Sequence, residues 1–320
     1  METSVAVIGV GVMGGPMARR LLDAGYDLTV CDMSDSALRE FAELGARTTR
    51  RAADCATAEV VLVVVNTPNQ LLDAMTGEDG LATGIVRSRP PLVAVMSTVA
   101  SHTVRDVGRQ LLQYGARLID APISGGEPRA QDGTLTIMMG GETGDVETAR
   151  TVLTHLGTRL FHCGPLGSGE TMKALNNVYS TVNSIVSAEV FRIGLEAGMT
   201  VSQITEVLEV STGRNFLTVS ESAVRDHFAR FTRTRGAFDS LMAMFRKDTD
   251  LAAQLAASSE GNFPVIGSLR TILNSLSDET YDNWCAVVDT EQNSLSPSRP
   301  QSIDPDTHGR GDPVDTHRSS

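Results

Sequence analysis

One lysine stands in a row of small polar residues along a segment with helical periodicity. Lys173 is followed one turn later by Asn177, and then by Ser180 and Ser184, so the four side chains fall on one side of a helix over residues 170–197. A lysine can exchange a proton with a substrate oxygen when burial moves its pKa toward neutrality. The row is a candidate acid–base site, and the alternative is the solvent-facing side of an amphipathic helix. The opposite side carries apolar residues at helical spacing, namely Met172, Leu175, Val178, Val182, Ile185, Val186 and Ile193.

A glycine-rich motif near the N-terminus is a candidate phosphate site. The pattern Gly-x-Gly-x-x-Gly directly follows a strand-like run and precedes a helical stretch that has Pro16 in its first turn. Its first glycine permits a tight turn, its second lets the backbone approach a pyrophosphate, and its third lets the helix pack on the strand. The N-terminus of that helix attracts phosphate. We therefore expect a dinucleotide to contact Gly9, Gly11, Val12, Met13 and Gly14.

An acidic residue at the end of the second predicted strand indicates which dinucleotide binds. Asp32 lies 18 residues after Gly14, near the spacing at which a carboxylate accepts hydrogen bonds from the adenosine ribose. Its charge would repel the additional phosphate of NADP, and neither Met33 nor Ser34 supplies an arginine. The sequence therefore predicts NAD as the cofactor. The alternative is that Asp32 caps a helix that begins near Ser34.

The loop at Ser124, Gly125 and Gly126 is a candidate site for a substrate carboxylate. It follows a predicted strand, and two glycines behind a serine leave backbone N–H groups open to an anion. The alternative is a turn that needs a positive φ. Together with a dinucleotide loop and an acid–base lysine, this loop indicates hydride exchange with a small hydroxycarboxylate.

Composition limits the classes of partner. The 320 residues have a formal net charge of -12, which argues against nucleic acid because phosphate binding needs clustered Lys and Arg. The longest apolar run, 60–65, is too short to cross a membrane, and the N-terminus has no signal-peptide pattern. The four cysteines form no Cys-x-x-Cys pair, so we expect no metal site. We expect a cytoplasmic protein that acts on a small molecule.

The order of the predicted elements indicates the fold class. Residues 1–164 alternate strands with helical stretches, which predicts an α/β domain with a doubly wound, mostly parallel sheet of the Rossmann type. Residues 165–291 form an all-helical domain in this interpretation, and the polar composition of residues 292–320 predicts a disordered tail. The expected strands are 4–8, 28–31, 60–65, 92–96, 117–119, 134–139 and 160–163. The expected helices include 16–24, 34–44, 170–197, 201–209, 238–257, 264–276 and 284–290.

Five motifs occur in the order that is seen in β-hydroxyacid dehydrogenases, and the chain resembles this family over residues 4–291. The motifs are Gly9 to Ala18, Ser97-Thr98, Asp120 to Gly126 with Gly133 to Leu135, Gly167 to Gly169 with Lys173 to Asn177, and Lys247 to Ala252. The resemblance implies a Rossmann-type domain followed by a helical domain like that of 6-phosphogluconate dehydrogenase. It also implies a homodimer or homotetramer, because the family associates through the helical domain.

The resemblance assigns roles to residues at the substrate. Lys173 is similar to the catalytic lysine that exchanges the hydroxyl proton, and Asn177 is similar to the residue that positions the substrate. Ser124, Gly125 and Gly126 resemble the loop that holds the substrate carboxylate.

Further roles concern the cofactor. Thr98 is similar to the family's contact near the nicotinamide ribose. Lys247 is similar to a lysine that closes over cofactor and substrate, although the residues alone favour a surface ion pair with Asp248 or Asp250. Val65 and Asn66 stand where the family commonly has a Leu-Pro pair in contact with the cofactor, and this chain departs from that pattern.

The expected activity is NAD-dependent oxidation of the β-hydroxyl of a small 3-hydroxycarboxylic acid, or the reverse reduction. An L-threonate- or tartronate-semialdehyde-type dehydrogenase is one alternative, and a non-catalytic dinucleotide-binding module is another. A 6-phosphogluconate dehydrogenase-like decarboxylase is disfavoured by Asn176, where that enzyme has histidine. An imine reductase is disfavoured by Lys173, which such enzymes usually replace.

Overall fold

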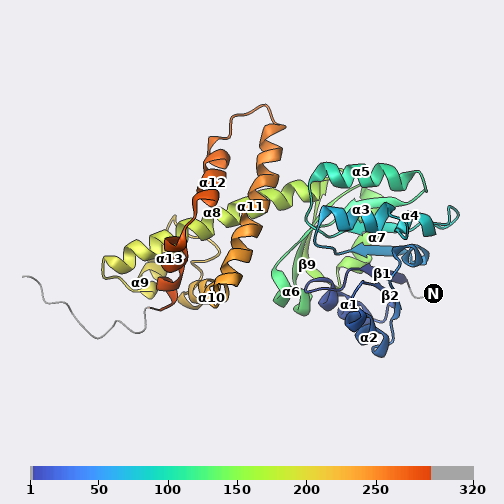
Figure 1. Cartoon of the computed structure of the whole chain (residues 1–320), viewed down its shortest axis with the longest axis horizontal. Coiled ribbons are helices and arrows are strands. Elements are labelled where there is room, and N and C mark those ends of the chain that lie inside the picture. The colour runs from blue at the N-terminus through green and yellow to red at the C-terminus, as the bar shows by residue number, and fades with distance from the viewer. Residues whose placement is uncertain (1–2, 290–320) are drawn as a thin grey trace, which may run out of the picture.

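The computed structural model describes residues 3–289, which form a sheet domain and a helical domain joined by one long helix (Figure 1). The predicted tail over 292–320 lies outside the described residues. Within 3–289, nine strands form one sheet in the order β3-β2-β1-β4-β5-β6-β8-β7, with β9 paired to β8. The strands β1 to β6 are parallel, whereas β8 runs antiparallel to β6 and β7. Their bounds are β1 Ser4–Ile8, β2 Asp27–Cys31, β3 Arg47–Thr49, β4 Val60–Val63, β5 Leu92–Val95, β6 Arg117–Asp120, β7 Ile123–Ser124, β8 Leu135–Gly140 and β9 Gly157–Gly164.

Helices cover both faces of this sheet. In β1, Val5 and Val7 belong to one hydrophobic cluster while Ala6 and Ile8 belong to another, because side chains alternate along a strand. Both faces are therefore buried, which explains why the central strands are continuously apolar. The covering helices are α1 Gly14–Asp23, α2 Asp35–Glu43, η1 Ala52–Thr57, α3 Pro68–Thr76, α4 Leu81–Gly84, α5 Ser101–Leu112, α6 Gly126–Asp132 and α7 Thr143–Leu153.

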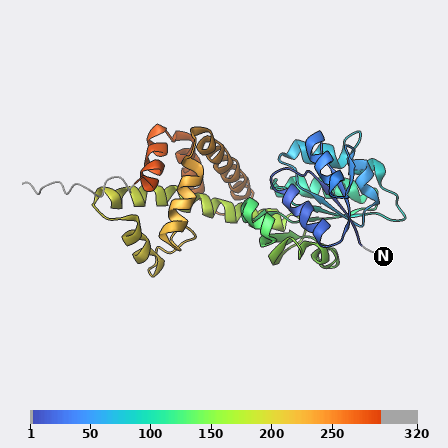
Figure 2. The same ribbon diagram turned by 90° about the horizontal axis from the view of Figure 1, so that it is seen from below.

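The second domain packs around aromatic side chains. The ring of Trp284, which is fully buried, lies 4.8 Å from that of Phe228 and 5.4 Å from that of Phe238, both in edge-to-face contact. Figure 2 shows α8 extending from the sheet domain through the length of this domain. The helices are α8 Ser168–Glu196, α9 Val201–Glu209, α10 Glu221–Thr232, α11 Arg235–Ala257, α12 Pro264–Ser275 and α13 Asp278–Val288. None of the helices within 3–289 has the length and apolar character needed to cross a membrane.

The predicted fold class is confirmed, with differences in individual elements. The sequence did not predict β3, β7 or α10, because Arg47–Thr49 has no apolar residue, β7 is two residues long, and α10 is mostly polar. The last helix begins at Asp278, where Ser277 and Thr280 form a capping box, and not at Trp284. The strand expected to reach Val65 ends at Val63.

The polar row of the long helix α8 is buried at Lys173 and Ser184 and half-buried at Asn177 and Ser180. Lys173 is 8% exposed and Ser184 is 1% exposed, because the sheet domain and α11 pack against that side. The alternative of a solvent-facing polar row is therefore wrong. On the side that the sequence marked as apolar, Val178 and Ile185 are buried, whereas others are exposed to solvent, namely Met172, Leu175, Val186 and Ile193.

The start of α8 is fixed to the sheet domain by Asp120 at the end of β6. Its side chain is fully buried, and its two oxygens accept hydrogen bonds of 2.7 Å from the backbone N–H groups of Gly167 and Glu170. These are N–H groups that a helix leaves without internal partners at its first turn. Asp120 thus caps α8 from another domain, and the helix begins in close contact with β8.

This close contact predicts the effect of a methyl group at Gly169. A Cβ at this position would lie 2.2 Å from the carbonyl oxygen of Met138 and 2.9 Å from Asp120 Oδ2, and neither a strand nor a capping carboxylate can yield easily. We expect Gly169→Ala to destabilise the protein by about 1–3 kcal/mol. In Gly267→Ala on α12, a Cβ meets no described atom within 4 Å, so we expect stabilisation of about 0.5–1 kcal/mol. Chemical denaturation of both variants checks this, and equal effects would contradict it.

Candidate active site

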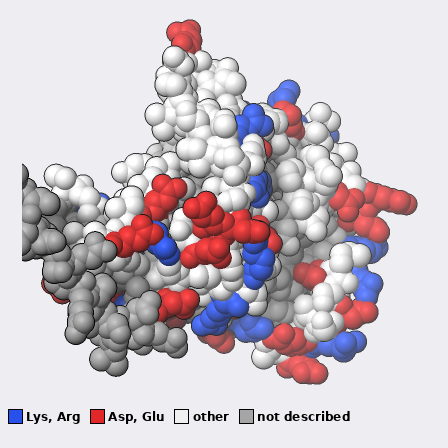
Figure 3. Space-filling view, turned by 60° about the vertical axis from the view of Figure 1, so that its left-hand side comes forward, with Lys and Arg blue, Asp and Glu red and all other residues white. Residues whose placement is uncertain are grey.

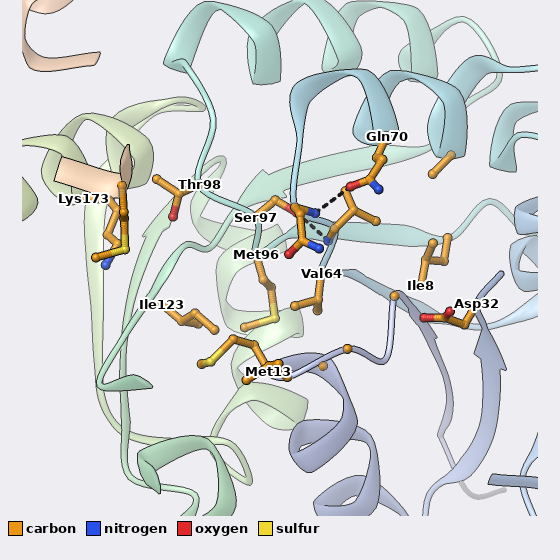
Figure 4. Close-up of a pocket in the computed structure, with 18 of the residues that line it drawn as sticks. Ile8, Met13, Asp32, Val64, Gln70, Met96, Ser97, Thr98, Ile123 and Lys173 are labelled. Atoms are coloured by element: carbon orange, nitrogen blue, oxygen red, sulfur yellow. Dashed lines mark hydrogen bonds between the residues drawn. The ribbon is translucent and has the colours of Figure 1, made fainter. Parts of the chain in front are cut away.

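A cleft of about 1020 Å³ lies between the two domains. Figure 4 shows Asp32 and Lys173 at opposite ends of it, with Met13, Val64 and Met96 between them. Every residue that the sequence analysis assigned to the site lines this one cleft: Gly9, Gly11, Val12, Met13, Gly14, Asp32, Val65, Asn66, Thr98, Ser124, Gly125, Gly126, Lys173, Asn177 and Lys247. The structure thus brings together segments that are far apart in the chain, and the roles of the individual residues stay predictions.

The glycines of the glycine-rich loop differ in the space that is available for a side chain. A Cβ at Gly14 would lie 1.9 Å from the carbonyl oxygen of Gly9, so α1 can pack on β1 only if this position has no side chain. A Cβ at Gly11 meets no described atom within 4 Å. Protein packing therefore does not require glycine at Gly11, whose bare backbone faces the cleft. This is the space that a pyrophosphate needs for a close approach to the backbone, and the residues present fit a dinucleotide.

Asp32 holds the loop and faces the cleft at once. Its Oδ2 accepts a 2.8 Å hydrogen bond from the N–H of Val10, and its Oδ1 accepts one of 2.8 Å from the N–H of Ser34. Ser34 in turn caps α2 by accepting from the N–H of Ala37. The two interpretations of Asp32 therefore do not compete, because one carboxylate supports the start of α2 and presents its charge to the cleft.

A cation also lies at this end of the cleft, although the sequence analysis did not find it. Arg50, in the segment after β3, lines the same cavity and forms an ion pair with Asp35 of α2. The search for an arginine considered only the residues directly after Asp32. The strand β3, which was not predicted, brings Arg50 there from 18 residues further on.

Side-chain acceptors fix the loops in the middle of the cleft. Ser97 Oγ accepts a 2.8 Å hydrogen bond from the N–H of Val65, and Gln70 Oε1 accepts one of 2.9 Å from the N–H of Asn66 (Figure 4). Gln70 also completes a capping box with Thr67 at the start of α3. The pattern Thr67-Pro68-Asn69-Gln70 is a recognisable capping signal, so the sequence could have indicated this support.

The loop after β7 has the geometry of an anion cradle. Gly125 has φ +137° and Gly126 has φ +70°, which are backbone conformations that residues with a side chain rarely adopt. The following helix α6 begins at Gly126, and no described side chain caps it. The loop is therefore a turn that needs positive φ angles, as one interpretation expects. The same turn directs the N-terminus of α6 toward the cleft, where it could attract a carboxylate, so the other interpretation fits the geometry as well.

Lys173 lies at the far end of the cleft beside Asn177 and Asp248. Burial lowers the pKa of the Lys173 ammonium, and the carboxyl groups of Asp248 and Glu170 oppose that change. Asn177 Nδ2 donates a 2.9 Å hydrogen bond to Asp248 Oδ2. Lys247 Nζ lies 3.7 Å from Asp248 Oδ1, while burial raises the pKa of the Asp248 carboxyl. The second and third turns of α8 and the middle of α11 thus place an amine, an amide and a carboxyl together.

The sequence contains two lysines, Lys173 and Lys247, and the structure places both in this cleft. All the other residues in the total of 27 Lys and Arg are arginines. The sequence analysis considered Asp248 as a surface partner of Lys247 and did not expect it in the site. Its 3% exposure and its bond to Asn177 show that it supports the residues beside Lys173.

Comparison with known proteins agrees with this geometry. Residues 4–164 match the family model described as the NAD binding domain of 6-phosphogluconate dehydrogenase, and residues 167–286 match the one described as NAD-binding of NADP-dependent 3-hydroxyisobutyrate dehydrogenase. The chain is 33% identical over 274 residues to NAD-dependent L-serine dehydrogenase of Pseudomonas aeruginosa, an alignment that covers 85% of this chain and 91% of that protein. It is 28% identical over 289 residues to human mitochondrial 3-hydroxyisobutyrate dehydrogenase, with coverage of 89% and 82%.

A solved structure is similar over the same range. The Mycobacterium tuberculosis 3-hydroxyisobutyrate dehydrogenase, in a structure with L-serine, has a TM-score of 0.75 and 26% identity, and the match covers 91% of this chain and 100% of that one. The two family models together span both domains, and the relatives match most of their own length. The chain therefore belongs to the β-hydroxyacid dehydrogenase family and is an NAD-dependent oxidoreductase of 3-hydroxy acids.

Proposed function

We propose that the enzyme oxidises the β-hydroxyl of a small 3-hydroxycarboxylic acid such as 3-hydroxyisobutyrate to the semialdehyde or keto acid, and that it also catalyses the reverse reduction. The observation that carries this proposal is the buried Lys173 at one end of a cleft whose other end is a dinucleotide loop. When NAD is bound, its nicotinamide supplies the hydride acceptor. The residues of this chain must then bind the acid, orient its hydroxyl and take the hydroxyl proton.

The amine of Lys173 takes that proton. A lysine in water is protonated at neutral pH and cannot act as a base, but burial favours the neutral amine. In the direction of oxidation the neutral amine accepts the hydroxyl proton, and in reduction the ammonium returns it to the carbonyl oxygen. The ammonium also stabilises negative charge that develops on this oxygen.

The substrate carboxylate and its orientation depend on other segments. The loop at Ser124, Gly125 and Gly126 would hold the carboxylate, which leaves the β-carbon toward Thr98 and the nicotinamide. Asn177 would bind the substrate one helical turn from Lys173, and its amide is held in place by the hydrogen bond to Asp248. The cleft is thus built to hold a short acid with one hydroxyl in reach of Lys173.

One observation favours L-serine as a second candidate substrate. Asp248 Oδ1 is buried and makes no hydrogen bond within the described part of the chain, although the residue lines the cleft. This oxygen forms an ion pair with Lys247 Nζ at 3.7 Å but receives no hydrogen bond from residues 3–289, so it is a suitable acceptor for the α-ammonium group of L-serine. The names of two relatives mention L-serine. NADH formation is measured with 3-hydroxyisobutyrate, L-serine, L-threonate and glycerate, the acid formed when tartronate semialdehyde is reduced. The acid that is oxidised identifies the substrate, and failure to oxidise all four would contradict the proposal.

Lys173→Ala should nearly abolish turnover. Loss of the proton acceptor should lower kcat by about 10²–10⁴-fold, while NAD binding, measured by calorimetry, stays near that of the unmodified enzyme. Lys173→Arg should fail too, because guanidinium keeps its proton. In the unmodified enzyme, the rate of oxidation should rise with pH as Lys173 loses its proton. The rise should end below pH 10.5, because burial lowers the pKa of Lys173 from the ordinary value of 10.5. Near-normal kcat in either variant would refute the role of Lys173.

The cofactor preference should depend on Asp32 and Arg50. We expect a higher kcat/KM with NAD than with NADP, because Asp32 repels the 2′-phosphate. Arg50, the cation at this end of the cleft, forms an ion pair with Asp35, which weakens its attraction for that phosphate. Asp32→Asn should narrow the preference by removing that repulsion. Adding Arg50→Ala to this variant should restore the preference for NAD, since the remaining cation is then lost. Steady-state kinetics with both cofactors decide, and a preference of the unmodified enzyme for NADP would show that the assignment is wrong.

The enzyme should be a homodimer or homotetramer that associates through the helical domain. An outer row on α8, formed by Met172, Leu175, Tyr179, Val186, Val190 and Ile193, is apolar and 40–72% exposed. The projecting upper part of the face in Figure 3, which contains the α11–α12 connection, is also largely uncharged. Apolar surface on this scale is typical of an interface. Light scattering should give a multiple of 34.1 kDa, and Val186→Lys with Ile193→Lys should reduce it. Val86→Lys, an exposed residue of the sheet domain, is the control.

A further inference from the structure

Glu170 is a buried carboxyl that the proposed reaction does not use. It lies on the first turn of α8, three residues before Lys173, and is 2% exposed. Its Oε2 accepts a 3.2 Å hydrogen bond from the N–H of Val99, 71 residues earlier in the chain. Its Oε1 is buried and makes no hydrogen bond within residues 3–289. Burying a carboxyl with one oxygen that receives no hydrogen bond costs free energy. Such a group therefore calls for a structural or functional explanation.

Glu170 lies behind the active-site cleft. It does not line that cleft but a second cavity of about 170 Å³, whose other polar lining residues include Ser101, His102, Arg105 and Gln254. Lys173 reaches into the cleft from the next turn of the same helix. The carboxyl of Glu170 therefore lies outside the cleft that would hold substrate and cofactor.

Titratable groups from four elements surround this carboxyl. Asp120 of β6 lies next to it, because Asp120 accepts the N–H of Glu170 itself. Lys173 of α8 and Lys247 of α11 favour its charged form, while burial and the charge of Asp120 raise its pKa well above the usual value. The remaining groups are His102 and Arg105 of α5 at the second cavity, and Asp248 of α11 on the cleft side of Lys173.

Glu170 is also connected to the active site through its hydrogen bond to the N–H of Val99. Val99 directly follows Thr98, which lines the cleft beside Lys173 (Figure 4). The Oε2 contact ties the backbone of this loop to the first turn of α8. A single side chain therefore touches both the loop that carries Thr98 and the turn that precedes Lys173.

We infer that Glu170 is a positioning residue of the dehydrogenase: it holds the Thr98 loop against α8 and, in its ionised form, places a negative charge near the Lys173 ammonium. This inference rests on the proposed role of Lys173. The ionised carboxylate favours the protonated amine, so above the pKa of Glu170 it keeps Lys173 able to donate a proton at a pH where burial alone would leave the amine neutral. The hydrogen bond to Val99 fixes the position of Thr98 relative to Lys173.

Two substitutions separate these two roles. Glu170→Gln keeps the size of the side chain and an oxygen that accepts the N–H of Val99, but it removes the charge. Glu170→Ala removes both. Glu189→Gln removes an exposed carboxylate on the same helix, about 24 Å from Lys173 at 1.5 Å per residue, and serves as the control.

The lysine content of the chain allows a direct measurement. With two lysines in the sequence, protein labelled with [13C]lysine gives two side-chain NMR signals, which Lys247→Arg assigns. Glu170→Gln should move the titration of Lys173 to lower pH by about one unit, which is the size expected for loss of one nearby charge. The acid limb of the pH profile for oxidation should move with it. Glu189→Gln should leave both in place.

The loop role has a separate readout. Glu170→Ala should raise KM for the hydroxy acid, and Glu170→Gln should restore it because the carboxamide oxygen replaces the acceptor. An unchanged Lys173 titration in Glu170→Gln would overturn the charge role, and equal KM values in the Ala and Gln variants would overturn the loop role. The NMR titration needs no substrate, so it still decides the charge role if the unmodified enzyme oxidises none of the hydroxy acids, a result that would refute the proposed function alone.

Discussion

The carboxylate of Asp120 is the interaction on which the active site depends. It lies at the end of β6, in the middle of a sheet that is buried on both faces, and it accepts the N–H groups of Gly167 and Glu170 at the start of α8. A helix N-terminus stabilises a negative charge in addition to its hydrogen bonds. Because Lys173 lies one turn further along, the cap sets the position of the Lys173 amine relative to the sheet. An ordinary surface cap could not do this, since its carboxylate would move with the helix.

The same cap explains how protons are distributed in the buried cluster. Burial raises the pKa of the Asp120 carboxyl, and the N–H groups that it accepts counter this. Glu170 receives one such N–H bond, from Val99, and it also experiences the charge of Asp120, so its pKa is raised further. Burial thus raises the pKa of both carboxyl groups, and the neighbouring charge of Asp120 raises that of Glu170 further. The two lysines of the chain face this cluster and Asp248 from the cleft side.

Local chemistry determined what the sequence could predict. The glycine-rich loop, the strand before it and Asp32 were found because each carries its signal within a few residues. The row from Lys173 to Ser184 was visible as well, but which side of α8 is buried depends on the sheet domain and α11, which no periodicity reports. Asp120 was seen as part of a motif and not as a cap, because its partners lie 47 and 50 residues away. Arg50 was missed with β3, whose three residues have no apolar pattern.

The acid–base property of Lys173 belongs to the junction of the domains and not to either domain alone. Burial is the main cause of its lowered pKa, and the cleft that Lys173 lines is formed by loops of the sheet domain and by α11 of the helical domain. The carboxyl groups that oppose burial are divided in the same way, since Asp248 comes from α11 while Glu170 depends on Val99 for its position. A shift of α8 or α11 away from the sheet would admit water and return Lys173 toward an ordinary lysine, which is protonated at neutral pH. Correct packing of the two domains is therefore a chemical requirement of the proposed proton transfer to Lys173 as well as a structural feature.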